Sequence, residues 1–468
     1  MLILYFLVLT IPSIIRYLND YITGNIRGPI PLPILGNIVV LINSFDNRIE
    51  FLKNLFKKYG NTCSVYFPSL SGMKRWIFIN ETESIKYILK DNFSNYPKGD
   101  EFHEIFEELL GNGIFNVDGC IWSTQRKISS YKFNINTLKT YMTDIFIKKT
   151  DITIDLIESQ FNLPEYKKKY IDIKPYFYDY TLLSIFEIGF GVDLESVQNS
   201  RIFSICFDLV QPLFEYRFIN PFWKLQRIMN SGNELKIKMY MKIINKEIYN
   251  IIERREQNTN KNDILSQFTN NKHLKNEQIR DILINFLIAG RDTTAALITR
   301  SYYMLLKYPE YQTKIMDEFN KYNNFDYNTI TKLKYMKAFL YEVLRMYPPV
   351  SKNSKIAVND DILPNGKKIK SGDRIIYSSQ LIGLSEKNFK DALNFNPERW
   401  LDNSKINPYK FLAFNAGYRT CLGQNMAILE ASIMLIKLLQ RFDFKLANDK
   451  IVEIDALLLE IKDLNIIK

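Results

Sequence analysis

The segment Phe414-Asn415-Ala416-Gly417-Tyr418-Arg419-Thr420-Cys421-Leu422-Gly423 leads into a stretch from about Gln424 to Arg441 that has the period of an amphipathic helix. It delivers one cysteine, Cys421, to the start of that helix. The unpaired N–H groups and the positive dipole end there favour a thiolate over a thiol, and a thiolate is the form that ligates a metal. Gly417 and Gly423 allow backbone to approach a flat cofactor closely.

A lone cysteine is more often a buried, inert small side chain, so the neighbours of Cys421 decide its interpretation. The ten-residue segment resembles the cysteine loop of the cytochrome P450 family at every constrained position. The resemblance implies that Cys421 is the axial ligand of the iron of haem b and that Phe414 packs beside its sulfur. It also implies that Gly423 adjoins the haem and that Arg419 binds a haem propionate.

A second motif, Ala289-Gly290-Arg291-Asp292-Thr293-Thr294, lies within a long helical pattern from Gln278 to Leu306. A threonine in a helix usually bonds the carbonyl four residues earlier, which bends the helix without any chemistry. The motif also resembles the oxygen-binding kink of the P450 family. That resemblance implies a local widening for dioxygen, with Thr293 holding a water and Asp292 feeding protons as the catalytic pair.

Glu342 and Arg345 lie one helical turn apart, a spacing that by default gives a surface ion pair worth under about 1 kcal/mol. Together with Pro397-Glu398-Arg399-Trp400 downstream, they resemble the Glu-Arg-Arg structural core of the family. The resemblance implies that Arg399 joins the pair and supports the cysteine loop. Trp400 stands where phenylalanine is frequent, a change that a packing role tolerates.

Trp122 and Arg126 are four residues apart and therefore share one helix face. In the family such a pair contacts the haem propionates, so both are predicted to bind the cofactor. The chain departs from the family after its proline pair, where Lys355 stands in place of a frequent arginine. Lysine keeps the charge but loses the forked geometry, so no propionate role is assigned to Lys355.

Composition and charge argue against several classes of function. Basic side chains number 62 and acidic ones 51, for a net charge of +11, but the lysines are spread along the chain with no basic stripe, so nucleic-acid binding is not expected. His103 and His273 are too few for a multi-histidine zinc site or a histidine-based hydrolase. Four scattered cysteines without a CxxC pair indicate reduced thiols facing the cytosol.

The N-terminus predicts a membrane anchor. Residues 1–15 are almost wholly apolar and would span roughly 22 Å as a helix, short of a hydrocarbon core of roughly 30 Å. A cleaved signal peptide is the alternative, but a positive leading region and a small-residue cleavage site are missing. Residues 1–18 are therefore predicted to be an uncleaved anchor. Residues 19–37, with alternating prolines from Pro29, are predicted to be a semi-rigid extended hinge.

Residues 38–468 are predicted to form one catalytic domain, mainly α with a small β region. Short strands are expected at Cys63–Phe67, Trp76–Ile79 and Asp373–Tyr377, and most of the remaining pattern is helical. No repeat or linker divides this region. By resemblance it has the cytochrome P450 fold, with haem between the long central helix and the cysteine-loop helix.

The resemblance implies a haem-thiolate monooxygenase that inserts one atom of O2 into a hydrophobic substrate. The stretches from Tyr96 to Gly99, Gly111 to Gly119 and Phe286 to Thr294 look most like the fatty-acid and alkane ω-hydroxylases of plants and fungi. Electrons are expected from a separate NADPH-cytochrome P450 reductase, docking near Lys127 and Lys132. The expected location is the endoplasmic reticulum membrane, with the catalytic domain facing the cytosol.

Two other functions stay open on sequence alone. A haem-thiolate isomerase or dehydratase rearranges peroxides without external electrons, but Asp292 and Thr293 count against it. A non-catalytic haem-binding sensor or carrier uses iron only to hold a ligand, and it leaves those two residues unexplained.

Overall fold

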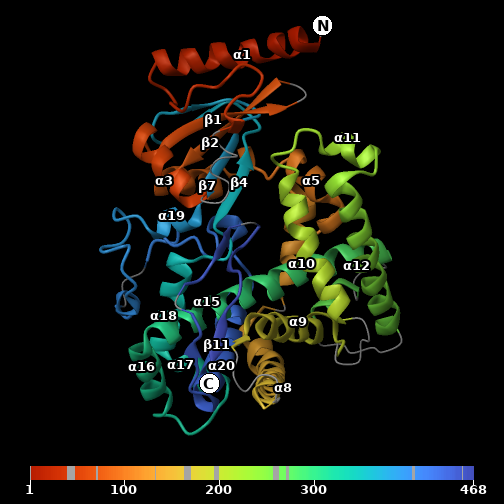
Figure 1. The fold of residues 1–468 in the computed structure, drawn as a ribbon, viewed down its shortest axis with the longest axis vertical. Coiled ribbons are helices and arrows are strands. Elements are labelled where there is room, and N and C mark those ends of the chain that lie inside the picture. Colours follow the sequence, from red (N-terminus) through yellow and green to blue (C-terminus); the bar gives the residue numbers. More distant parts are fainter. Residues whose placement is uncertain are drawn as a thin grey trace.

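The computed structural model describes residues 2–39, 48–69, 72–131, 133–162, 170–193, 200–256, 263–269, 274–402, 406–448, 450–455 and 457–467. Lys132 and His273 lie outside the described residues. The chain is mainly helical, with its largest sheet towards one end of the long axis (Figure 1). This arrangement confirms the predicted fold class.

A long helix runs through the centre in three parts, α14 (Asn276–Leu287), the π-helical turn η7 (Ile288–Asp292) and α15 (Thr293–Lys307). It is long and apolar enough to cross a membrane, yet 78% of its most apolar window is buried inside the fold, as a core helix should be. It packs against α9 (Lys174–Phe190) and α20 (Gln424–Arg441) in one large hydrophobic core. Both the long helix and α20 match their predicted extents.

The other helical segments surround this core or cover the sheet. They are α1 (Leu2–Ile22), α3 (Arg48–Tyr59), α4 (Thr82–Lys86), η2 (Tyr87–Asp91), η3 (Phe93–Asn95), α5 (Asp100–Leu110), α6 (Gly119–Ser130), α7 (Ile135–Thr137), η4 (Leu138–Met142), α8 (Thr143–Phe161), α10 (Ser200–Tyr216), α11 (Trp223–Ile228), α12 (Gly232–Glu256), α13 (Ile264–Thr269), α16 (Pro309–Phe319), α17 (Tyr327–Lys332), α18 (Lys334–Met346), α19 (Ser379–Gly383), η8 (Pro397–Trp400) and η9 (Gly417–Arg419).

The main sheet has the strand order β1-β2-β7-β4, in which β2 and β7 are parallel and the other neighbours antiparallel. Its three predicted strands are present, with ends that differ from the prediction by at most four residues. The strands are β1 (Thr62–Ser69), β2 (Gly72–Ile79), β7 (Arg374–Ser378) and β4 (Lys352–Ile356). Short pairs and a three-stranded sheet use β3 (Ile171–Asp172), β5 (Asp361–Ile362), β6 (Lys368–Ile369), β8 (Lys445–Leu446), β9 (Glu453–Asp455), β10 (Leu459–Ile461) and β11 (Asn465–Ile467).

Both faces of β1 are covered, which explains why its first six residues are all buried instead of alternating. On one face Val65 packs with Leu52 and Leu55 of α3. On the other, Tyr66 meets Tyr17 of α1 edge to face, with ring centres 6.2 Å apart. The N-terminal helix is therefore part of the sheet's packing.

The N-terminal segments differ from the pattern expected of them. Helix α1 continues to Ile22, past the predicted boundary at residue 18, because its polar residues find partners on the sheet. The predicted extended hinge contains a turn, since the backbones of Leu32 and Gly36 bond each other. Ile26 of the same segment is buried and Arg27 pairs with Cys63 of β1. The segment predicted to be a hinge is therefore packed against the main sheet of the catalytic domain.

Candidate active site

Cys421 lies in the turn between η9 and α20, and its backbone N–H donates to the carbonyl of Phe414 at 2.8 Å. Gly423 directly precedes α20. Gly417 has a φ of +68°, and a Cβ there would lie 2.2 Å from the carbonyl oxygen of Leu89. The close approach that requires glycine at 417 is therefore to the backbone of η2, which differs from the expected approach to a cofactor.

The ionisation of Cys421 is set mainly by burial. Its side chain is accessible to solvent, yet the surrounding protein raises the pKa of the thiol above its ordinary value. A hydrogen bond from the Gly423 N–H and the charge of Arg126 lower the pKa without offsetting burial. A metal cation bound at the sulfur would favour the thiolate, because a coordinating thiol is deprotonated.

Trp122, Arg126 and Arg419 come together beside the cysteine loop. Trp122 and Arg126 lie on α6, as predicted, and Arg126 donates to the carbonyl of Thr420 at 2.7 Å. Arg419 donates to Asp118 at 2.6 Å, and its guanidinium lies 4.5 Å from the centre of the Trp122 ring. The structure therefore unites the three side chains to which the sequence assigned propionate contacts.

Two lysines join this group. Lys98 donates to the carbonyl of Phe115 at 2.6 Å. Lys355 on β4 is 2% exposed, and its ammonium has no hydrogen-bond partner in the described part of the chain. Burial, aided by the positive charge of Arg419, lowers the pKa of Lys355 to about 7. The same two effects and the charge of Lys355 lower the pKa of Lys98.

These cations fit the two carboxylates of haem b. Lys98, Arg126, Lys355 and Arg419 form a group whose partner in the described structure is the carboxylate of Asp118. The ammonium of Lys355 and Nε of Arg419 are buried without a hydrogen bond in the described part. Buried unpaired cations are costly, so the group favours a dianionic ligand next to Cys421. Sequence reasoning missed Lys98, whose one signal was its place within the Tyr96–Gly99 stretch.

The predicted widening of the long helix is present as the π-helical turn η7. The Thr293 hydroxyl donates to the carbonyl of Ala289 at 2.6 Å, the back-bond usual for a helix threonine. Gly290 is required by packing, since a Cβ would lie 2.7 Å from Ile185 of α9. The structure thus contains both the bend and the widening, and the catalytic role of Thr293 stays a prediction.

Asp292 is 2% exposed and lies under α10. Its carboxylate accepts from Arg291 at 2.6 Å and from the amide of Gln211 at 2.9 Å. Arg291 also pairs with Asp208, which is half exposed. Burial raises the pKa of Asp292 to about 6, against the lowering effect of Arg291. This shift brings the pKa of Asp292 closer to neutral pH, which suits a proton-transfer group. Its partner Gln211, far away in sequence, was not predicted.

Glu342 and Arg345 form a fully buried pair, in contrast to the default surface pair. Two bonds of 2.8 Å join them, and Arg399 donates to the same carboxylate at 3.0 Å. The predicted three-residue contact is thus present. The indole N–H of Trp400 also donates to Glu342 at 2.8 Å. Sequence reasoning gave Trp400 a packing role alone and missed this bond.

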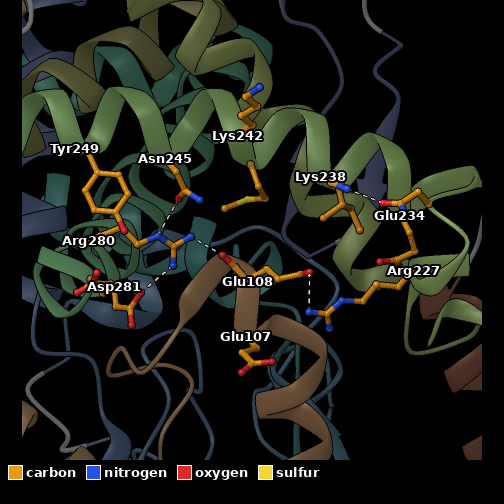
Figure 2. A pocket seen from close by; sticks show the side chains of 14 residues that line it. Glu107, Glu108, Arg227, Glu234, Lys238, Lys242, Asn245, Tyr249, Arg280 and Asp281 are labelled. Atoms are coloured by element: carbon orange, nitrogen blue, oxygen red, sulfur yellow. Dashed lines mark hydrogen bonds and ion pairs between the residues drawn. The ribbon is translucent and has the colours of Figure 1, made fainter. Parts of the chain in front are cut away.

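A polar cavity of about 620 Å³ lies elsewhere, between α5, α12 and the start of α14 (Figure 2). Arg280 is one of its lining residues and bonds Asn245 at 2.9 Å, Asp281 at 2.8 Å and the backbone of Glu108. None of the side chains assigned above lines it. Its charges pair largely with one another, so it has no part in the proposed chemistry.

A cysteine loop beside a buried cationic group, in a chain whose long central helix has a widened turn with a buried acid, is typical of a haem-thiolate protein. Residues 26–466 match the cytochrome P450 family. Cytochrome P450 704B1 of Arabidopsis thaliana is 32% identical over 92% of both chains. Cytochrome P450 94C1 of the same plant is 32% identical over 79% of both. Cytochrome P450 monooxygenase cyp1 of Mycosarcoma maydis is 30% identical over 91% of this chain and 70% of its own.

The chain belongs to the cytochrome P450 family. It is a P450 monooxygenase, and family membership implies the haem-thiolate cofactor, O2 and a redox partner. The isomerase and the sensor are therefore set aside.

Replacing Trp400 by phenylalanine should lower the free energy of unfolding by about 1–3 kcal/mol, because Glu342 loses a donor while buried. Urea unfolding measures the change. The control is Trp76→Phe, at a tryptophan that stacks on Phe67 with ring centres 4.6 Å apart. Equal stability of Trp400→Phe and the parent protein would show that the indole bond contributes nothing.

Replacing Lys355 by methionine should stabilise the haem-free protein and speed haem loss from the loaded one. Between pH of about 7 and 10.5, the unfolded state holds a proton on Lys355 that the folded state lacks, so stability rises with pH across that window. The variant should lack this part of the rise in thermal scans. Lys352→Met is the control, since Lys352 has acidic partners. Loss of stability with unchanged haem retention would contradict the assignment.

Proposed function

We propose that this P450 hydroxylates a long aliphatic substrate of the fatty-acid class. The observation that carries the proposal is an aromatic cluster between α5 and α10. Phe106 has its ring centre 6.1 Å from that of Phe214 and 5.9 Å from that of Phe218, and Phe102 lies 4.9 Å from Phe106. Aromatic side chains of this kind are typical of sites that bind long apolar chains.

The cluster adjoins the proposed proton-transfer residues. Phe214 lies on α10, one helical turn after Gln211, which bonds Asp292. The Gly111–Gly119 stretch is fastened to the long helix, because Asn285 accepts from the N–H of Phe115 at 2.9 Å and donates to the carbonyl of Leu110 at 2.8 Å. Of the stretches that resemble the ω-hydroxylases, Gly111–Gly119 is therefore bonded to the helix that carries Asp292, and Phe286–Thr294 is part of that helix.

The proposed cofactor residues divide into a ligand and supports. Cys421 would bind the iron, with Phe414 and Gly423 beside its sulfur, while Arg126 and Arg419, with Trp122 against them, would hold the propionates. Bound haem supplies oxygen activation, and the protein positions the substrate and supplies protons. Glu342, Arg345 and Arg399 are proposed to support the loop from beneath.

Proton supply is proposed to run from solvent to Asp292. The half-exposed carboxylate of Asp208 bonds the buried guanidinium of Arg291 at 2.5 Å, and Arg291 bonds Asp292 at 2.6 Å. Arg291 keeps its own proton, so in this line it orients Asp292 towards the surface of α10, and water beside Asp208 would carry the proton. Asp292 would hold the proton and Thr293, the next residue, would position the water that receives it.

Electron supply and location follow the family. A separate NADPH-dependent reductase is proposed to dock on the face that carries Lys127, which is exposed on α6 beside Arg126. The protein is proposed to sit on the endoplasmic reticulum membrane with its catalytic domain in the cytosol. Exposed Ile11, Ile15 and Leu18 of the N-terminal helix support contact with lipid.

Replacing Thr293 by alanine should divert reducing equivalents to hydrogen peroxide, because water near the π-helical turn loses its hydroxyl partner. Peroxide released per NADPH consumed measures the effect. Thr299→Ala is a matched control, since Thr299 makes the same back-bond, to Ala295 at 2.7 Å, on the same helix. Equal coupling in both variants would contradict the role of Thr293.

A panel of C12 to C18 fatty acids and of terpenoids, titrated against the haem absorption spectrum, tests the substrate class. Fatty acids should shift the spectrum of the haem-loaded protein, and terpenoids should not. A response to terpenoids alone would overturn the fatty-acid proposal and leave the monooxygenase assignment intact.

A further inference from the structure

Two cations contact the ring of Tyr178, on α9. The ammonium of Lys174 lies 5.2 Å from the centre of this ring, and the guanidinium carbon of Arg291 lies 5.0 Å from the same centre. Lys174 is partly exposed, whereas Arg291 is 1% exposed and belongs to the π-helical turn η7. A cation–π contact is worth more when the cation is removed from water. The contact with Arg291 is therefore the stronger of the two.

The hydroxyl of Tyr178 has a carboxylate partner. It donates to Glu460 of β10, and Glu460 also pairs with Lys174 at 2.8 Å. Burial, followed by the charge of Glu460, raises the pKa of Tyr178 well above its ordinary value, so the phenol keeps its proton at neutral pH. A phenol that donates to an anion has a more electron-rich ring, which attracts a cation at its face more strongly.

The guanidinium of Arg291 has two carboxylate partners in different surroundings. Its Nη1 atom lies 2.5 Å from Asp208 and 2.6 Å from Asp292. Asp208 is half exposed and Asp292 is buried, so water favours a shift of the guanidinium towards Asp208. The rings of Tyr178 and of Phe207, whose centre is 5.8 Å away, contact the guanidinium and oppose such a shift.

We propose that Tyr178 is a positioning residue of the proton supply, in which its ring holds the Arg291 guanidinium against the buried Asp292. The inference rests on the proposed role of Asp292 and adds a residue to it. The bond from the hydroxyl to Glu460 joins α9 to β10 and fixes the place of the ring. Tyr178 acts on Asp292 through Arg291.

The position of Arg291 affects the protonation of Asp292. Burial raises the pKa of Asp292 to about 6, and the charge of Arg291 opposes this rise. If Arg291 moves towards Asp208, its lowering effect weakens and Asp292 keeps its proton to a higher pH. Loss of the cation–π contact should raise the pKa of Asp292 by on the order of half a unit.

Other charged groups surround this pair and are unchanged in the variants below. They lie on three elements, with Asp208 and Arg201 on α10, Asp179 and Lys174 on α9, and Glu460 on β10. All five are exposed or partly exposed, so water screens their effect on Asp292 more than it screens that of buried Arg291. A change in the titration of Asp292 therefore reports the substitution at position 178.

The test is an infrared titration of the full-length, haem-loaded protein. The band of the protonated Asp292 carboxyl is identified by its absence from Asp292→Asn, and its midpoint gives the pKa. Tyr178→Phe is compared with trifluorophenylalanine at position 178, because fluorine withdraws electron density from the ring face at nearly constant size. The same two substitutions at position 180 are the control. Tyr180 is also buried on α9, and its hydroxyl bonds the carbonyl of Glu430 at 3.3 Å.

The midpoint should be about half a pH unit higher with trifluorophenylalanine than with phenylalanine at position 178, and equal for the two proteins altered at position 180. Equal midpoints at position 178, or the same rise at position 180, would overturn the role of Tyr178. Peroxide released per NADPH consumed tests the proposed proton supply separately. If Asp292→Asn releases no more peroxide than the parent protein, the role of Asp292 fails, and the positioning role fails with it whatever the midpoints.

Discussion

The buried carboxylate of Glu342 is the contact on which the cysteine loop depends. It accepts from Arg345, from Arg399, from the indole of Trp400 and from the N–H of Asn396 at 2.8 Å. A buried charge is tolerated only when it is fully bonded, and this carboxylate is. Its donors come from α18 and from the segment that leads to Cys421. The Glu342 carboxylate therefore joins α18 to that segment.

A series of packed aromatic rings connects the Glu342 carboxylate to the cysteine loop. Trp400 packs on Phe411 with ring centres 4.9 Å apart, and Phe411 lies 6.3 Å from Phe414. The carbonyl of Phe414 accepts from the N–H of Cys421. A rigid path thus runs from the Glu342 carboxylate to the proposed iron ligand. A ligand held in this way needs little reorganisation when it binds a metal.

Local sequence patterns were enough to predict the main helices and the site residues that belong to one short motif. The helix after the cysteine loop, the long central helix and the π-helical widening were all predictable from spacing and from motif. Lys98 and Gln211 could not be predicted, because the partners of both lie far away in sequence. The charges of Arg419 and Lys355 act on Lys98, and Gln211 bonds Asp292. The ion pair of Arg16 with Asp373 was hidden for the same reason, since Asp373 lies 357 residues after Arg16.

The central claim is that Cys421 gives a thiolate to haem iron. The most direct measurement is the absorption spectrum of the dithionite-reduced, carbon monoxide-bound protein, recorded for the parent chain and for Cys421→Ala. The account predicts the red-shifted Soret band of thiolate-ligated haem in the parent, and its loss in the variant. The same band in Cys421→Ala, or its absence from a haem-loaded parent protein, would contradict the account.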